Sequence, residues 1–393
     1  MSEPAKTYKA AVLTAQGTPP TFTIQSLPLP QPGPHEVLVR LRLTSLCGTD
    51  CSQAAGHLGA TRPVLGHEGV GEIAALGSHV AALFTSLSSF PSSSSTDTSA
   101  PLALGQRVGV AWTRDACGTC AYCTTLHHDG ETRCVRRPHS GQACDGTFAQ
   151  YTLVPARYLL RIPADRFGAV PDELVAPVLC GGVTAYKALK TLGSAAGGGQ
   201  LSPGQWIAVS GASGGVGAFA VAFGRAMGYR VIAVDAGRDK GEYALQEGAE
   251  HYVDITGDEA NQQDGGGVAS AVKALTGVDK LGVAAVIVCA GAAAAYQSAV
   301  EMLAPFGTLM CVGIPPPEGV FSLHPLQFIG GGVRVMGSSV GTRRDTLEAL
   351  EFVSRGLVTP AVQWAELKDM ERLMDHVVAG KVRGKYVINL DKV

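Results

Sequence analysis

The spacing of hydrophobic and polar positions changes about halfway along the chain. In the first part, short apolar runs are separated by proline and glycine, and Val37, Val39, Leu41 and Leu43 alternate with polar or outward-facing positions. A period of two is expected of a half-buried strand. The first part is therefore predicted to form an antiparallel, β-rich domain.

From about Pro203 the apolar runs become continuous and alternate with segments of helical character. The runs are WIAVSGA, YRVIAVDAG, VAAVIVCAG, TLMCVGIP and VRVMGSSVG. Continuous apolar strands that alternate with helices indicate βαβ units and a parallel sheet covered on both faces. The C-terminal part returns to a mixed pattern and ends in KYVINL, which we expect to be a closing strand.

Composition and charge narrow the class of protein. The chain has 393 residues, 46% of them hydrophobic and 16% charged, which is enough for two domains with a sizeable core. A net charge of −2 gives no general attraction to nucleic acid or to an anionic membrane, and neither is expected as a partner. A serine- and threonine-rich tract at about 84–101 lacks periodicity and is interpreted as a flexible surface insertion without an assigned role.

The N-terminus and the apolar segments predict a cytoplasmic protein. The first residues lack the pattern of a secretory signal, and the most apolar stretch, 281–295, is too short to cross a bilayer comfortably. Thiols stay reduced in the cytosol, so metal ligation or simple burial is favoured over disulfide formation for the ten cysteines.

A glycine-rich turn, SGASGGVG, joins a predicted strand to a predicted helix. Aligned on the Rossmann fingerprint, Ala212, Gly214 and Gly217 take the three glycine positions, with Gly211 and Gly215 beside them. Glycines there allow a sharp turn and close approach of the backbone to a pyrophosphate. A plain turn between a strand and a helix would also tolerate glycine, but the setting favours a dinucleotide site.

Asp235 follows this turn at the end of the next predicted strand. A carboxylate at that position accepts hydrogen bonds from the ribose hydroxyls and would repel a 2′-phosphate, so NAD(H) is predicted over NADP(H). Arg238 lies nearby and could pair with that phosphate, which keeps NADP(H) open.

Four cysteines follow the pattern C-x2-C-x2-C-x10-C at Cys117, Cys120, Cys123 and Cys134. Four thiolates could surround one tetrahedral Zn²⁺ and leave no site for substrate, so such an ion would be structural. An iron–sulfur cluster is an alternative, although the last spacing does not match the ferredoxin run. Four free thiols remain another, and His127 or His128 could replace the fourth cysteine as a ligand.

Three further residues form a dispersed set. Cys47 follows a strand, His67 lies in LGHEG, and Cys180 stands at the start of a predicted helix. Two thiolates and an imidazole are the ligand pattern of a catalytic zinc with an open fourth position. Each residue alone would more simply be a buried cysteine or a structural histidine, and spacing alone does not show that the three converge.

Taken together, the motifs resemble those of the zinc-dependent medium-chain alcohol dehydrogenases, particularly their tetrameric microbial branch. They are LCGTD, GHEGVGEI, CGTCAYC…C, DGTFAQY, APVLCGGVTAYKAL, SGASGGVG, AMGYRVIAVD, GSSVGTRRDTLEAL and GKYVINL, in the order of the family. The resemblance implies two Zn²⁺ per chain. Cys47, His67 and Cys180 match the catalytic ligands, and the four clustered cysteines match the structural ones.

The resemblance also implies an α/β architecture of two domains. A GroES-like, β-rich catalytic domain would comprise 1–180 and 336–393, with the structural zinc lobe at about 112–140. A Rossmann coenzyme domain with a doubly wound parallel sheet would comprise 181–335, with the active site in the cleft between the domains. A homotetramer is implied, with a homodimer as the alternative.

Individual roles follow from the same resemblance. Thr49 would hydrogen-bond the substrate oxygen, Asp50 would orient the ring of His67, Glu68 would assist ligand exchange at the metal, and Trp112 would form a wall of the substrate pocket. Lys385 stands where the branch often has an arginine near the pyrophosphate. The implied coenzyme residues are Gly211, Gly214, Gly215, Val216, Gly217, Asp235, Lys240 and Lys385.

One departure concerns the proton relay. The histidine of the family's relay is replaced by Ser52, which cannot act as a base near neutral pH. General acid–base assistance is worth about 10²–10⁴-fold, so the rate or its pH dependence should differ from that of relatives. The proton would have to pass through water, the ribose hydroxyls or another side chain such as His57.

The sequence therefore predicts reversible oxidation of primary or secondary alcohols to aldehydes or ketones, with hydride transfer to NAD⁺ and the substrate oxygen on zinc. A specialised carbonyl or enal reductase of a biosynthetic pathway is the alternative on the same fold. A zinc-free reductase of activated double bonds and a non-catalytic, dinucleotide-binding relative are further alternatives. The individual small-molecule alcohol or carbonyl substrate is not identified by the sequence.

Overall fold

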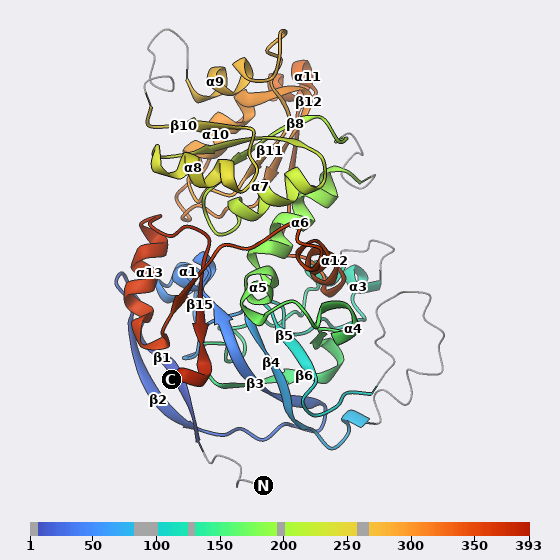
Figure 1. Cartoon of the computed structure of the whole chain (residues 1–393), viewed down its shortest axis with the longest axis vertical. Coiled ribbons are helices and arrows are strands. Elements are labelled where there is room, and N and C mark those ends of the chain that lie inside the picture. The colour runs from blue at the N-terminus through green and yellow to red at the C-terminus, as the bar shows by residue number, and fades with distance from the viewer. Residues whose placement is uncertain (1–6, 82–100, 125–129, 195–200, 258–266) are drawn as a thin grey trace.

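The computed structural model describes residues 7–81, 101–124, 130–194, 201–257 and 267–393. Two lobes are seen in Figure 1, one built on the N-terminal strands together with the C-terminal segment, and the other on the parallel strands of the second half. The serine-rich tract lies almost wholly outside the described residues, as do His127 and His128. No helix in the described part of the chain is long and apolar enough to cross a membrane.

The first lobe contains a seven-stranded sheet in the order β14-β15-β3-β4-β5-β7, with β6 also paired to β3. Its pairs are antiparallel except for β14 with β15, which confirms the predicted β-rich domain. A separate antiparallel hairpin packs alongside. The strands are β1 (Thr7–Ala15) and β2 (Thr21–Pro28) in the hairpin, and β3 (Glu36–Ser45), β4 (Gly69–Leu76), β5 (Arg107–Val110), β6 (Tyr151–Pro155), β7 (Leu160–Arg161), β14 (Val362–Ala365) and β15 (Lys385–Asn389) in the sheet.

The second lobe is a six-stranded parallel sheet in the order β10-β9-β8-β11-β12-β13, which confirms the predicted doubly wound architecture. Alternate residues of its strands reach opposite faces: Ile207 and Val209 join one hydrophobic cluster, and Ala208 joins another. The strands are β8 (Trp206–Ser210), β9 (Arg230–Asp235), β10 (His251–Asp254), β11 (Val283–Val288), β12 (Leu303–Cys311) and β13 (Arg334–Gly337).

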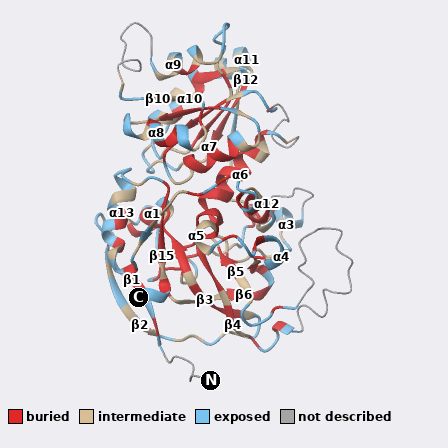
Figure 2. Ribbon diagram, viewed as in Figure 1, coloured by how far each residue is buried: buried red, intermediate tan, exposed pale blue. Residues whose placement is uncertain are grey.

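Helices cover both faces of the parallel sheet. They are α6 (Gly181–Leu192), α7 (Gly217–Ala226), α8 (Asp239–Gln246), α9 (Val268–Ala274), α10 (Ala293–Met302) and α11 (Pro325–Gly331). Buried residues are concentrated in the central strands of both sheets and in α6 (Figure 2). The domain boundary expected between 335 and 336 falls within β13, whose pairing with β12 continues to Gly337.

The remaining helices of the described residues carry several of the residues of interest. They are α1 (Gly48–Ala54), α3 (Ala121–Thr124), η1 (Gly130–Arg133), η2 (Ala156–Tyr158), α4 (Ala164–Phe167), α5 (Asp172–Val175), η3 (Ala176–Leu179), α12 (Arg343–Ser354), η5 (Leu367–Asp369), α13 (Met370–Val378) and η6 (Leu390–Lys392). Leu347 and Leu350 of α12 pack with Tyr186 and Leu189 of α6 in one hydrophobic cluster.

Candidate metal and coenzyme site

The dispersed set of Cys47, His67 and Cys180 is brought together by the ends of three elements. Cys47 follows β3 as the N-cap of α1, His67 precedes β4, and Cys180 is the N-cap of α6. Because β3 and β4 pair antiparallel, the chain leaving one strand lies beside the chain entering the other. The three side chains therefore meet between the sheet and α6, and all three are buried.

The geometry of this cluster fits a metal ion. The Sγ atoms of Cys47 and Cys180 are 3.9 Å apart, and one ligand atom from each of Cys47, His67, Glu68 and Cys180 lies within 4.8 Å of the others. The Nε2 of His67 is buried and has no hydrogen-bond partner. Burying an unpaired nitrogen is costly, and two thiols with an imidazole nitrogen are a donor set that zinc prefers.

Two neighbours set the protonation of this donor set. Asp50 accepts a hydrogen bond from Nδ1 of His67 at 2.8 Å, so Nε2 is the ring nitrogen left to face the cluster. A hydrogen bond with Cys180 holds the pKa of Cys47 well below its ordinary value, against the opposing effect of burial, and the charge of Lys385 acts in the same direction as the hydrogen bond. A thiolate at Cys47 is therefore favoured, which is the form that binds metals.

Glu68 contributes a buried carboxylate held by two partners. Its oxygens accept hydrogen bonds from the hydroxyl of Ser45 and from the amine of Lys385. Burial raises the pKa of Glu68 to about 7, although the charge of Lys385 opposes that change. Glu68 was expected near the metal from the sequence, whereas Ser45 was not identified; no residue spacing indicates a contact between side chains of this kind.

Lys385 lies between the cluster and the glycine turn. It is only 4% exposed, and its Cδ would lie 2.9 Å from a Cβ at Gly215, so the side chain runs along this turn before its amine reaches Glu68. The aliphatic part of the Lys385 side chain lies beside the glycine turn, where the resemblance places a pyrophosphate. The amine of Lys385, however, is directed to the carboxylate of Glu68.

The glycine turn follows β8 at the carboxyl edge of the parallel sheet, beside the point where the strand order reverses between β8 and β11. Dinucleotides bind at such a switch point. Gly211 has a φ of 74°, and a Cβ at Gly217 would meet the carbonyl oxygen of Gly211 at 2.0 Å. A Cβ at Gly214 would have only that oxygen within 4 Å, at 3.4 Å, so the backbone is open to a ligand there. Val216 is the N-cap of α7.

Asp235, at the end of β9, is tied to this turn. Its carboxylate accepts hydrogen bonds from the backbone N–H of Ser213 at 2.8 Å and from the amine of Lys240 at 3.2 Å. Asp235 and Lys240, two of the three coenzyme residues predicted outside the turn, are therefore adjacent. Ala212, the departure from the fingerprint, is fully buried in the core, where its methyl group is accommodated.

The four clustered cysteines also converge. Cys117, Cys120, Cys123 and Cys134 each offer a sulfur within 4.8 Å of the others. Backbone N–H groups of Cys117 and Arg136 donate to the sulfur of Cys134 at 3.3 and 3.4 Å. Hydrogen bonds from Arg136 and from backbone N–H groups lower the pKa of Cys117 to about 5. A thiolate is thus favoured at Cys117, and four convergent sulfurs in a closed arrangement suit a structural Zn²⁺.

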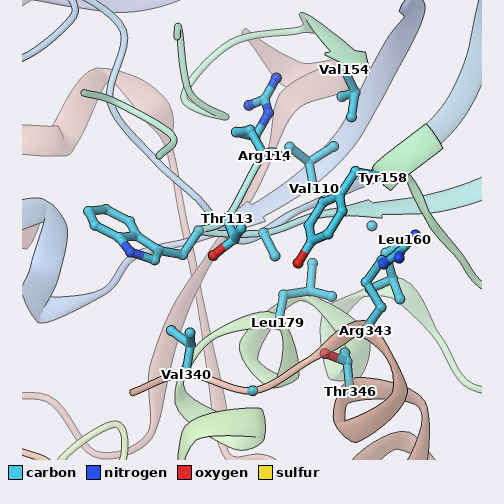
Figure 3. Close-up of a pocket in the computed structure, with 14 residues that line it drawn as sticks. Val110, Thr113, Arg114, Val154, Tyr158, Leu160, Leu179, Val340, Arg343 and Thr346 are labelled. Carbon is cyan, nitrogen blue, oxygen red and sulfur yellow. The ribbon is translucent and has the colours of Figure 1, made fainter. Parts of the chain in front are cut away.

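A pocket adjoins the cluster of Cys47, His67 and Cys180. The indole of Trp112 meets the ring of His67 edge-on, with centroids 5.2 Å apart, and stacks on His139 at 4.6 Å. The pocket is lined by Gly109, Val110, Ala111, Trp112, Thr113, Arg114, Val154, Tyr158, Leu160, Leu179, Val340, Gly341, Arg343 and Thr346 (Figure 3). Trp112 therefore contacts both the pocket and His67. His139, which sequence analysis did not identify, stacks on the indole of Trp112.

The remaining predicted residues lie on or after α1. Thr49 and Ser52 are half-buried in this helix, whose N-cap is Cys47, and His57 is exposed in the turn that follows. Their roles in substrate binding and proton transfer stay predictions.

Comparison with known proteins finds similarity over both lobes. Residues 33–164 match the family model described as an alcohol dehydrogenase GroES-like domain, and residues 215–355 match the model described as a zinc-binding dehydrogenase. An alcohol dehydrogenase of Rhizobium meliloti is 36% identical over 390 residues, which cover 98% of this chain and 99% of the relative. Alcohol dehydrogenase 1 of Emericella nidulans is 34% identical over 369 residues, which cover 93% of each.

Solved structures give the same result. The alcohol dehydrogenase of the hyperthermophilic archaeon Aeropyrum pernix aligns with a TM-score of 0.78 and 25% identity, over 97% of this chain and 99% of that one. The acetophenone reductase of Geotrichum candidum, solved in complex with NAD, aligns with a TM-score of 0.77 and 22% identity over 100% of both chains. The similarity in fold therefore includes both lobes and the arrangement between them.

Proposed function

The chain belongs to the zinc-dependent medium-chain alcohol dehydrogenase family, and on that premise we propose that it catalyses the reversible, NAD(H)-dependent oxidation of primary or secondary alcohols to aldehydes or ketones. It is an oxidoreductase. One observation carries the specific proposal: the buried, unpartnered Nε2 of His67 faces the thiols of Cys47 and Cys180 beside a dinucleotide-type turn.

Cys47, His67 and Cys180 would hold a catalytic Zn²⁺. When bound, the ion would supply Lewis-acid stabilisation of negative charge on the substrate oxygen. When bound, the nicotinamide coenzyme would accept the hydride that the carbinol carbon loses in the oxidative direction, while the hydroxyl loses its proton and the carbonyl product forms. Trp112 excludes water from one side of the reacting centre.

The hydroxyl of Thr49 would accept the hydrogen bond of the substrate hydroxyl and would give up its own proton as it takes the substrate's. Thr49 is half-buried on α1 and directly precedes Asp50, whose carboxylate bonds to His67 and to the N–H of Cys47. Ser52, one turn further along α1, would pass the proton on through water or the ribose hydroxyls, because a serine does not act as a base at neutral pH. A slower proton step than in relatives with histidine is expected.

NAD(H) is the proposed coenzyme. The carboxylate of Asp235 lies at the end of β9, where the adenosine ribose would bind, and its side chain is only 12% exposed. A 2′-phosphate placed there would face a buried negative charge. The amine of Lys240, 3.2 Å from the carboxylate of Asp235, neutralises part of that charge. The preference for NAD(H) therefore requires that the carboxylate of Asp235 lie nearer to the 2′ position of the ribose than the amine of Lys240 does.

The four-cysteine lobe would hold a second, structural Zn²⁺, and the chain would assemble as a homotetramer or a homodimer. Support for assembly comes from β13, which ends the order of the parallel sheet. Apolar side chains are exposed on this strand and on the neighbouring α11, namely Val335, Leu326, Phe328 and Ile329. An edge strand with an apolar flank is a surface that a second copy can cover, and the mass in solution tests this.

The proposed function is tested by NADH oxidation with a panel of aldehydes, ketones and enals, repeated with NADPH and after metal chelation. Chelator-sensitive reduction of saturated carbonyls with NADH is the expected result. Reduction confined to enals would favour a specialised reductase on the same fold. Binding of NADH without turnover of any member of the panel, in protein of full zinc content, would favour a non-catalytic relative.

A further inference from the structure

We propose that Glu131 is a positioning residue through which the four-cysteine lobe holds one wall of the pocket beside Trp112. The lobe would then act on substrate binding as well as on stability. The effect on substrate rests on the proposed function; the contact between the lobe and the pocket wall does not.

The wall in question is the segment 338–342, which joins β13 to α12. Val340 and Gly341 line the pocket together with Trp112, and Figure 3 shows Val340 at one end of the lining and Arg343 and Thr346 of α12 at the other. Val340 has a φ of 44°, in the left-handed region that a β-branched residue avoids. Such a conformation persists only where the surrounding contacts enforce it.

Both ends of this segment are held by η1 of the four-cysteine lobe. Arg133 donates a hydrogen bond from Nη2 to the carbonyl oxygen of Gly337, at 3.3 Å. Glu131 accepts one from the backbone N–H of Arg343 at 3.0 Å and another from its Nη2 at 3.5 Å. The residue before the segment and the residue after it are therefore both fixed to a single turn of the lobe.

The contact with Arg343 is suited to a carboxylate. Arg343 is the first residue of α12, so its N–H has no partner within the helix and lies at the positive end of the helix dipole. The guanidinium of Arg343 lies over the ring of Tyr158, 4.3 Å from its centroid, and donates to the carbonyl oxygen of Arg157 at 3.2 Å. Glu131 thus binds both the backbone and the side chain of a residue that lines the pocket.

The position of Glu131 is set by the cysteine lobe itself. Cys134 directly follows η1, and its N–H donates to the carbonyl oxygen of Glu131 at 3.3 Å. Gly130 approaches α3 so closely that a Cβ there would lie 1.8 Å from the carbonyl oxygen of Tyr122, next to Cys123. The turn that brings Cys134 to the other sulfurs is therefore the turn that presents Glu131 to α12.

The segment has a second anchor. Thr342 and Asp345 form a capping box at the start of α12, and Asp345 pairs with Lys190 of α6 at 2.8 Å. Asp345 is almost fully buried, with its side chain 3% exposed, whereas the side chain of Glu131 is 21% exposed. Glu131 is thus the anchor that can be removed with little loss of core packing.

The experiment compares Glu131→Ala, Glu131→Gln and Arg343→Ala with wild type, using zinc content, amide hydrogen exchange of 338–343, and kcat and KM for a carbonyl. Glu366→Ala is the matched control, because Glu366 forms an exposed ion pair with Lys368. In Glu131→Ala we expect faster exchange at 338–343 and a KM about tenfold higher, the loss expected of one hydrogen bond to a charged group. Glu131→Gln should recover part of both effects, since its amide oxygen still accepts from the N–H of Arg343.

Two results would overturn the proposal. One is wild-type exchange and wild-type KM in folded, zinc-replete Glu131→Ala. The other concerns Arg343→Ala, which decides if Glu131→Ala loses zinc. Arg343→Ala breaks the side-chain contact with Glu131 but leaves the four-cysteine lobe unchanged. Wild-type exchange at 338–343 and wild-type KM in Arg343→Ala would then overturn the proposal. Hydrogen exchange requires no turnover, so a wild-type protein inactive on every carbonyl would remove the proposed function while leaving this test in force.

Discussion

Oδ1 of Asp50 lies 2.8 Å from Nδ1 of His67, and both side chains are fully buried. The other oxygen of Asp50 accepts a hydrogen bond from the backbone N–H of Cys47 at 2.9 Å. One carboxylate therefore orients two of the three proposed metal ligands. This arrangement also follows from chain order, since Asp50 and Cys47 belong to the same first turn of α1.

Asp50→Asn should weaken metal binding at the cluster of Cys47, His67 and Cys180. The amide would present an N–H₂ group either to Nδ1 of His67 or to the N–H of Cys47, so one of the two hydrogen bonds is lost. Removal of such a partner costs about 10–100-fold in metal affinity. Competition with a chromogenic chelator measures this affinity, and Asp391→Asn, which alters an exposed ion pair with Arg40, serves as the control. Equal affinity in Asp50→Asn and wild type would contradict the assignment.

Asp235→Ala should shift coenzyme preference toward NADP(H). Removing the carboxylate leaves Lys240 without its partner at 3.2 Å and free to meet a 2′-phosphate. The ratio of kcat/KM with NADPH to that with NADH is expected to rise about tenfold or more. Glu250→Ala, in an exposed ion pair with Arg230 ahead of β10, should leave the ratio unchanged. A ratio unaltered by Asp235→Ala would place the ribose elsewhere.

Cys120→Ser should act on stability. With one thiol of the four-cysteine lobe missing, the proposed structural Zn²⁺ would be lost and its binding free energy would no longer contribute to folding. The zinc content should fall by one ion per chain and the Tm by about 5 °C or more. Cys311→Ser, in β12 and outside both clusters, is the matched control. A soluble Cys120→Ser protein with wild-type Tm and zinc content would contradict the proposal that the four cysteines hold a structural Zn²⁺.

Glu247 should make stability dependent on pH. Burial raises its pKa from 4.5 to about 7. Between these values the folded chain retains a proton that the unfolded chain has released, so the free energy of unfolding falls as pH rises from 4.5 to 7. Glu247→Gln removes this contribution and should gain stability relative to wild type across that window. Denaturant unfolding of both proteins at each end of the window measures the difference, and a constant difference would contradict the prediction.

The two sheets and most strand positions could be predicted from residue patterns alone. The alternating pattern of β3 indicates a strand buried on one face, and the continuous apolar runs of β8, β9 and β11 indicate strands buried on both faces. These patterns lie within single short segments, so they can be recognised without knowing how the chain packs. The expected boundary between 335 and 336 stays a prediction, and it falls within the short edge strand β13.

The contacts that complete the site could not be predicted in this way. Ser45 with Glu68, Glu68 with Lys385, and Glu131 with Arg343 join residues that lie far apart in the chain. Each contact depends on how elements pack in space, and no periodicity records it. The convergence of Cys47, His67 and Cys180 was likewise available only from the family resemblance, until β3, β4 and α6 were seen to place them together.

The most direct test of the proposed mechanism is turnover by Cys47→Ser, measured together with NADH binding and zinc content. We expect loss of carbonyl reduction and of one zinc ion per chain, with NADH affinity close to that of wild type, because the glycine turn and Asp235 do not include Cys47. Wild-type turnover in a folded Cys47→Ser protein would contradict the assignment of Cys47, His67 and Cys180 as the catalytic metal site.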